Sequence, residues 1–219
     1  MSDARGLAPG RPVPGAVSNA EGQILGRKGR ETRQRLMAAA RDLLGVCSPV
    51  DLTAVAVARH AGMASATFYL YFRDVPDLLL ATGETATIEM VAAFTQSILF
   101  RDRSRIAEDS TAFIEMLRHW WEQHGVILRY RAMEADRGEE RFRLQREWWA
   151  SAVLDRLFLL SREAADTGDD LDAYADALVV FASVERLAAA VQRERDMPIP
   201  PERMRAAQAR MLVRMLGPA

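Results

Sequence analysis

The sequence predicts an all-α protein of about nine helices. Apolar residues recur at helical spacing along most of the chain, and no segment alternates apolar and polar residues as a strand would. Glycine or proline stands at several expected helix ends, as at Gly62, Gly138 and Pro198. With 219 residues, 49% of them hydrophobic, the chain can bury the cores of a small domain and a larger one.

The chain divides into three expected parts. Residues 1–26 are rich in glycine, proline, alanine and serine without periodicity, which predicts a disordered N-terminal tail. Residues 27–74 contain three short amphipathic segments, and residues 75–219 contain a series of longer ones. Helices are expected over residues 31–44, 75–99, 105–123, 125–135, 139–165, 171–193 and 202–216, in addition to two short ones within residues 51–80.

Residues 51–80 have the pattern of two short helices joined by a tight turn and followed at once by a third helix. The hydroxyl of Thr53 can cap the first helix. Gly62 allows the left-handed backbone of a sharp turn, and the second helix is expected from Ser65 to Phe72. This is the sequence form of a helix-turn-helix DNA reader.

The second of these helices has an inner and an outer aromatic face. Phe68 and Phe72 are four residues apart and are expected to point inward together. The residues left on or near the surface are Thr67, Tyr69, Leu70 and Tyr71. Aromatic residues on the outside of so short a helix need a partner. A DNA groove with its phosphates supplies one.

These residues resemble the TetR family of bacterial transcriptional regulators, and the resemblance covers residues 30–81. The matching positions are Thr32, Arg33, Ala39, Ala40, Leu43, Leu44, Thr53, Val57, Ala58, Ala61, Gly62, Met63, Thr67, Phe68, Tyr69, Tyr71, Phe72, Leu78 and Leu79. Ala64 departs from the family pattern, because the family has a capping serine there; either Ser65 takes the cap or the helix end is held less firmly. Val75 stands where the family favours a phosphate-binding lysine, and Arg73 is the nearest replacement cation.

The resemblance implies a one-component transcriptional regulator, acting as a repressor. A homodimer would bind an inverted-repeat DNA operator, and a hydrophobic small-molecule ligand in the second domain would release it. The implied DNA contacts are Arg33, Thr53, Ser65, Ala66, Thr67, Tyr69, Leu70, Tyr71 and Arg73. A basic patch precedes and enters the first helix, and it suits either phosphate contact or an ordinary solvated face: Arg27, Lys28, Arg30, Arg33 and Arg35.

The second domain contains all four tryptophans, as two adjacent pairs. With other apolar residues they can line a pocket for the ligand, or they can pack in the core, as aromatic stripes more often do. The candidate ligand-binding residues are Phe113, Met116, Leu117, Trp120, Trp121, Tyr130, Met133, Trp148, Trp149 and Phe181.

The last two helices are expected to pair with their copies in a second chain, as the resemblance implies. The apolar stripes that fit such a contact are Leu178, Ala182, Leu187, Met204, Met211, Leu212 and Met215. Burial of these stripes within one chain is the alternative. A dimer suits two reader helices about 34 Å apart, one turn of DNA.

Composition argues against several other classes of protein. The formal net charge of −1 excludes a uniformly basic protein, and the single cysteine, Cys47, fits a reducing cytoplasm. No apolar run reaches membrane length, so no membrane association is expected. His119 and His124 lack the spacing of a helical metal site, and no nucleotide or nucleophile motif is present. We expect no catalytic residue, metal or cofactor.

Two alternative functions remain open from the sequence. The first is a DNA-binding regulator without a small-molecule effector, whose second domain serves dimerisation or protein contacts only. The second is a helical enzyme or carrier that retains a vestigial reader.

Overall fold

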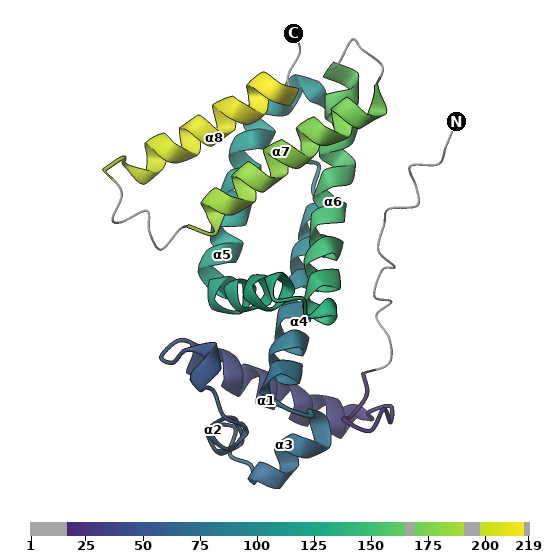
Figure 1. Ribbon diagram of the computed structural model, residues 1–219, viewed down its shortest axis with the longest axis vertical. Helices are drawn as coiled ribbons and strands as arrows, with labels where there is room; N and C mark the ends of the chain where they lie inside the picture. Colours follow the sequence, from purple (N-terminus) through teal and green to yellow (C-terminus); the bar gives the residue numbers. More distant parts are fainter. Residues whose placement is uncertain (1–16, 165–168, 191–197, 217–219) are drawn as a thin grey trace. The chain divides into compact units, whose positions relative to one another are not determined.

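The computed structural model describes residues 17–164, 169–190 and 198–216, and these residues are helical with no strand (Figure 1). The predicted all-α class is confirmed. The described residues form eight α-helices: α1 (Arg27–Leu44), α2 (Ala54–His60), α3 (Ser65–Tyr71), α4 (Val75–Gln96), α5 (Ile106–Asp136), α6 (Glu140–Ala164), α7 (Asp170–Ala188) and α8 (Pro201–Leu216). Two short 3₁₀ turns are η2 (Pro49–Asp51) and η3 (Arg103–Arg105).

The helix count is lower than expected because the segments 105–123 and 125–135 form one helix, α5. Gly125 lies inside α5 and is buried. Glycine costs a helix interior only about 1 kcal/mol relative to alanine, so it does not by itself end a helix whose neighbours are buried. The turn after α5 is at Gly138, which has a φ of 93°. The expected helix ends at residues 165 and 193 lie outside the described residues.

The chain forms two compact units, and their boundaries fall inside helices. The first unit comprises residues up to Thr87 together with Val126–Arg146; the second comprises Ile88–Gly125 and the residues from Glu147 onward. The first unit therefore includes the beginning of α4, which the sequence analysis placed with the second domain. Side chains of α5 and α6 are bonded there to α4: Gln145 Nε2 donates to Leu80 O at 3.0 Å, and Arg131 Nη1 donates to Thr87 Oγ1 at 3.2 Å.

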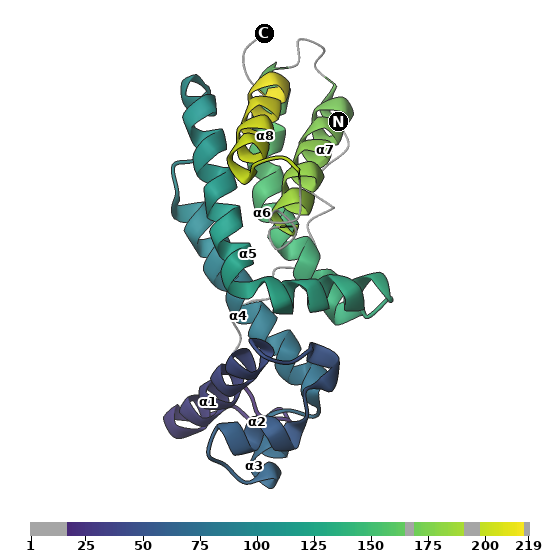
Figure 2. The same ribbon diagram turned by 90° about the vertical axis from the view of Figure 1, so that its left-hand side faces the viewer.

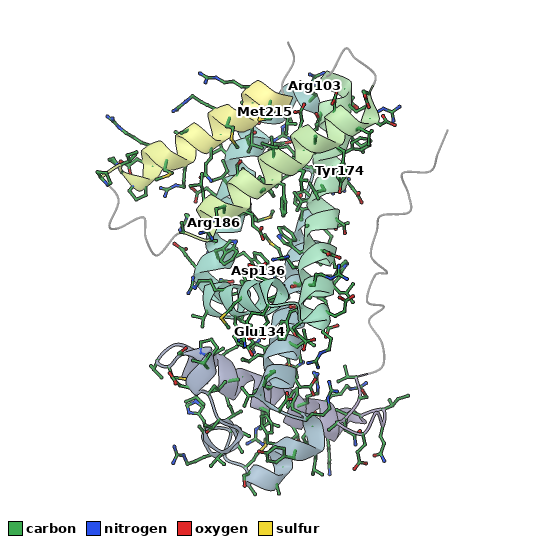
Figure 3. All side chains as sticks on the ribbon, viewed as in Figure 1. Arg103, Glu134, Asp136, Tyr174, Arg186 and Met215 are labelled. Carbon is green, nitrogen blue, oxygen red and sulfur yellow. The ribbon has the colours of Figure 1, made fainter. Side chains whose placement is uncertain are left out.

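The second unit has an aromatic and aliphatic core contributed by α4 to α8, with α7 and α8 side by side (Figures 1 and 2). Arg156 on α6 closes the end of α4, because its guanidinium donates to Thr95 O at 2.8 Å and Leu99 O at 2.9 Å. The same guanidinium lies 4.6 Å from the ring centroid of Phe94. Figure 3 shows the side chains along these helices, including Tyr174 on α7 and Met215 on α8.

Within the described residues, α4 has the length and composition of a membrane-spanning helix, with a mean hydropathy of 1.2. Half of that window is buried inside the protein, as expected of a core helix.

Candidate nucleic-acid interface

Helices α2 and α3 form the two-helix unit that the sequence predicts. Thr53 caps α2, because its hydroxyl accepts a hydrogen bond from the Ala56 amide at 3.1 Å. The amide of Met63 donates to the carbonyl of Ala58 at 2.8 Å, and this hydrogen bond stabilises the turn between the two helices. Phe68 of α3 is fully buried, so packing fixes α3 on the rest of the unit.

The turn between α2 and α3 depends on Gly62, whose φ is 68°. A side chain in this left-handed region is strained even where space is open, and a Cβ at Gly62 would have its nearest neighbour 3.8 Å away. Arg35 of α1 holds the same turn, because its Nη2 donates to the carbonyl of Ala61 at 2.8 Å. Arg35 was predicted only as part of the basic patch; the structure shows that it anchors the turn.

The inner face of α3 is confirmed. The side chains of Phe68 and Phe72 are 0% and 1% exposed, and their ring centroids are 5.7 Å apart. Tyr69 contacts Phe68 edge-on, with 5.3 Å between the centroids, yet remains 55% exposed. A buried aromatic pair therefore supports an exposed tyrosine.

The predicted DNA-contact residues on the outer face of α3 fall into two groups by exposure. Exposed residues are Ser65, Ala66, Tyr69 and Leu70, and half-buried residues are Thr67 and Tyr71. Leu70 is 61% exposed, so this face combines apolar and hydroxyl-bearing side chains. Such a surface suits base edges and phosphates together.

The N-terminus of α3 has no side-chain cap. Ala64 occupies the cap position and offers no acceptor, while Ser65 is the first residue of the helix and does not cap it. The start of the helix is instead closed by a backbone hydrogen bond, from the amide of Thr67 to the carbonyl of Ala64 at 2.9 Å. Ser65 therefore does not take the cap, and the helix begins without one.

Arg73, the expected replacement cation, is engaged within the protein. Its Nη2 donates to Asp77 Oδ1 at 3.1 Å, and this hydrogen bond, with the attraction of Asp77, raises the pKa of the exposed Arg73. Asp77 is also 3.7 Å from Arg141. Asp74 accepts from the Asp77 amide at 2.7 Å and caps α4. The carboxylate of Asp77 therefore offsets part of the charge that Arg73 would bring to a phosphate.

Arg33, a predicted contact to the DNA backbone, is half-buried beneath α3. Its guanidinium carbon lies 4.8 Å from the ring centroid of Phe72, and Nη1 donates to Met37 Sδ at 3.3 Å. Burial lowers the pKa of Arg33, while Glu84 and Asp77 oppose that shift. Burial likewise raises the pKa of Glu84, and Arg33 opposes it. These contacts give Arg33 a packing role in the first unit. Within the basic patch, Lys28 and Arg30 are exposed, and Arg27 pairs with Glu31 at 2.9 Å.

A segment before α1 contacts α3, which the sequence analysis missed. Residues 17–26, expected to be disordered, form a turn in which Leu25 N donates to Val17 O at 2.8 Å. Asn19 Oδ1 accepts from the amide of Gln23 at 2.8 Å, and Ala20 N donates to Leu70 O at 3.1 Å. The prediction of a disordered tail is wrong for these residues; residues 1–16 lie outside those described. Asn19 and Gly22 are turn-favouring residues and were the available signal.

The predicted ligand-binding residues separate between the two units. In the second unit, six are buried and two are half-buried: Phe113, Leu117, Trp120, Trp121, Trp149 and Phe181, then Met116 and Trp148. Tyr130 and Met133 belong to the first unit. The continuous helix α5 contributes to both units, which the sequence analysis did not anticipate.

The aromatic residues of the second unit pack directly on one another. The Trp149 ring centroid lies 5.1 Å from that of Trp120, 6.2 Å from that of Phe181 and 6.3 Å from that of Phe94. The indole nitrogens of Trp121 and Trp149 are buried without a hydrogen-bond partner among the described residues. A buried donor without an acceptor costs about 1–3 kcal/mol.

The predicted dimer residues also differ in exposure. Leu178 is 46% exposed on α7, close to the exposed Leu171 and Tyr174. Ala182 is exposed, and Leu187, Met204, Met211 and Met215 are half-buried. Leu212 is fully buried inside its own chain, so it belongs to the core of the second unit and cannot contact a partner.

The geometry of α2 and α3 defines an all-helical protein with a helix-turn-helix unit, and solved structures share its fold. SCO7518 from Streptomyces coelicolor, described as a transcriptional regulator, matches with a TM-score of 0.63 and 19% identity over 85% of this chain and 98% of that one. A protein from Mesorhizobium loti assigned to the TetR-family transcriptional regulators matches with a TM-score of 0.62 and 17% identity, over 88% and 100% of the two chains.

The fatty acid degradation regulator FadR from Bacillus halodurans matches with a TM-score of 0.61 and 12% identity, over 88% of this chain and 95% of that one. No protein-family model and no curated protein matches the sequence. The fold is that of TetR-like transcriptional regulators, as the resemblance over residues 30–81 implied.

Proposed function

We propose that this protein is a one-component transcriptional repressor that binds an inverted-repeat DNA operator as a homodimer and is released by a hydrophobic small molecule. The observation that carries the proposal is the outer face of α3. Tyr69 and Leu70 are exposed there on a helix that Phe68 and Phe72 fix from beneath. The aromatic face would lie in the major groove, as the second helix of a helix-turn-helix does.

The proposed DNA contacts are those of the exposed or half-exposed surface of α3: Ser65, Ala66, Thr67, Tyr69, Leu70 and Tyr71. Thr53 and Arg73 flank this surface; each is exposed, although each is also bonded within the protein. Exposed Lys28 and Arg30 would add phosphate contacts, whose contribution falls as salt rises.

Selection from a pool of random duplex DNA with the purified protein tests sequence-specific binding. An enriched inverted repeat, bound more weakly at higher salt, is the expected result, and a pool without enrichment would contradict the proposal. On the selected operator, Tyr69→Ala is expected to lower affinity by about 30-fold or more, as for a central interface residue. Leu159→Ala removes a side chain of the second unit that is 56% exposed and serves as the control. Equal operator affinity of both variants would remove Tyr69 from the interface.

Dimerisation would use the exposed apolar side of α7. Leu171, Tyr174 and Leu178 are 79%, 40% and 46% exposed, and they follow helical spacing on that helix. The half-buried methionines of α8 would extend this surface. A two-fold dimer places two copies of α3 on successive turns of DNA, which matches an inverted repeat.

The ligand response is proposed for the second unit. The unpartnered indole N–H groups of Trp121 and Trp149 are donors that an acceptor on a bound ligand would satisfy. The direct packing of Trp120 on Trp149 favours the alternative, a regulator whose second unit has a filled aromatic core and serves dimerisation or protein contacts only. Screening small molecules for release of the selected operator distinguishes the two. For a ligand to release the protein from DNA, it must bind more tightly to the state that does not bind DNA.

A further inference from the structure

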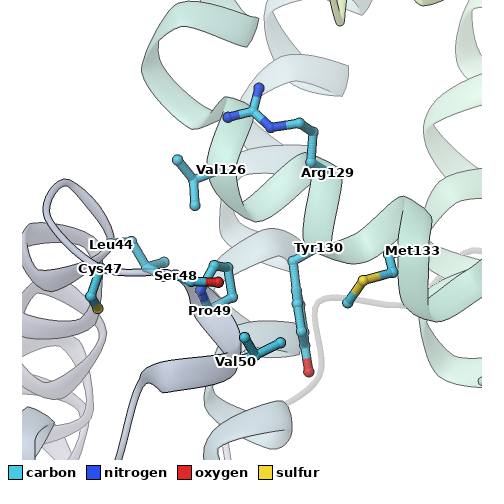
Figure 4. Close-up of a pocket in the computed structure, with 9 residues that line it drawn as sticks. All are labelled: Leu44, Cys47, Ser48, Pro49, Val50, Val126, Arg129, Tyr130 and Met133. Atoms are coloured by element: carbon cyan, nitrogen blue, oxygen red, sulfur yellow. The ribbon is translucent and has the colours of Figure 1, made fainter.

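A cavity of about 300 Å³ lies within the first unit, between the connection from α1 to α2 and the part of α5 that belongs to that unit (Figure 4). Its walls are mostly apolar, with Leu44 and Pro49 on one side and Val126 and the ring of Tyr130 on the other. This volume is at the lower end of the range of small-molecule sites, about 300–1,000 Å³.

A single cation lines this apolar cavity. Among the described residues, Arg129 has no hydrogen bond or ion pair, unlike the arginines that are paired along the same helix, such as Arg118 with Glu115 at 2.8 Å. Burial alone lowers the pKa of Arg129, and no acidic group opposes that shift. In Figure 4 its guanidinium lies at the Val126 end of the cavity, whereas Tyr130 extends toward Val50. A partly desolvated cation without a counter-charge favours an anionic ligand.

We propose that this cavity binds a small carboxylic acid with an apolar body, whose carboxylate pairs with Arg129 and whose body lies against Pro49, Val126 and Tyr130. A monoanion matches the one guanidinium, and a planar carboxylate can accept two parallel hydrogen bonds from it. A dianion would bring an uncompensated charge to apolar walls.

The cavity adjoins the segment that leads into α2, so a bound ligand could influence the helix-turn-helix. Pro49 begins the 3₁₀ turn η2, and Thr53, the cap of α2, follows two residues after that turn ends. A ligand against Pro49 would restrain the segment that leads into α2. This site belongs to the first unit and not to the tryptophan-rich second unit. Ligand binding to it does not depend on recognition of an operator.

Cys47 provides a local measurement of occupancy. It lines the same cavity, is half-exposed, and is the only cysteine of the chain, so a thiol reagent modifies one known position. Octanoate is the probe, and octanol is the uncharged molecule of matched length. Octanoate is expected to slow labelling of Cys47 saturably, and octanol to need about tenfold or more higher concentration for the same protection, since a charge-assisted hydrogen bond is lost.

Two variants test the role of the charge. Arg129→Gln is expected to remove the preference for octanoate over octanol, while Arg41→Gln, an exposed arginine of α1 in the same unit, is expected to keep it. Circular dichroism checks that both variants fold. Equal protection by octanoate and octanol in the unmodified protein, a preference for octanoate that persists in R129Q, or no protection at any concentration would each overturn the proposal.

Discussion

Replacing Ala64 with serine is expected to supply the missing cap of α3. Ala64 has a φ of −69° and a ψ of 148°, the extended backbone of a cap residue. Thr53 has the same ψ at the cap of α2, and its hydroxyl reaches the amide three residues later at 3.1 Å. A serine hydroxyl at position 64 is expected to accept from the amide of Thr67 as well, sharing it with the carbonyl of residue 64, to which that amide already donates at 2.9 Å.

The size of the effect follows from the value of a cap, about 1 kcal/mol. If α3 opens locally, exchange of its amide hydrogens should slow about fivefold in Ala64→Ser. If the protein unfolds as a whole, its Tm should rise by about 2–4 °C. Ala66→Ser adds the same hydroxyl inside α3, where it cannot act as the cap, and is the control. Exchange no slower in A64S than in A66S would refute the argument that an absent cap limits α3.

Two further predictions concern the dimer and the buried acid. Leu178→Arg is expected to give a monomer, because a two-fold interface would bring the two new charges together, and sedimentation measures this; the exposed Leu159→Arg is the control. A dimer in L178R would exclude this side of α7 from the interface. Burial raises the pKa of Glu84. A carboxyl group whose pKa is raised by folding contributes its full stabilisation to the folded protein below its unfolded pKa, about 4.3. That contribution is lost as pH rises through the pKa of the folded state. The stability of Glu84→Gln relative to the unmodified protein should therefore increase as pH rises above about 4 in urea unfolding, and a pH-independent difference would contradict this.

The helix-turn-helix could be predicted from the sequence because its signals are local. Thr53 caps the helix that it precedes, Gly62 turns the chain where it stands, and Phe68 and Phe72 are one helical turn apart. Each of these features depends on residues within a few positions of one another. The predictions for α2 and α3 were therefore confirmed nearly residue for residue.

The fate of the arginines could not be predicted in this way. Arg33 and Arg35 both lie in the basic patch, but Phe72 and Ala61 engage them from distant positions in the chain. The contact of Ala20 with Leu70 likewise joins residues far apart in the sequence. A pattern of charges does not show which cations are already engaged, so only the folded chain distinguishes exposed Lys28 and Arg30 from half-buried Arg33.

The sequence by itself determined the helical class, the helix-turn-helix and the aromatic face of α3, since periodicity, caps and glycine turns act over one or two helical turns. Only the tertiary structure decided that α5 runs through Gly125 and contributes to both units, that Trp120 packs on Trp149, and that Arg129 faces an apolar cavity. These outcomes depend on which distant side chains exclude water from one another. Burial of that kind is a property of the packed chain as a whole.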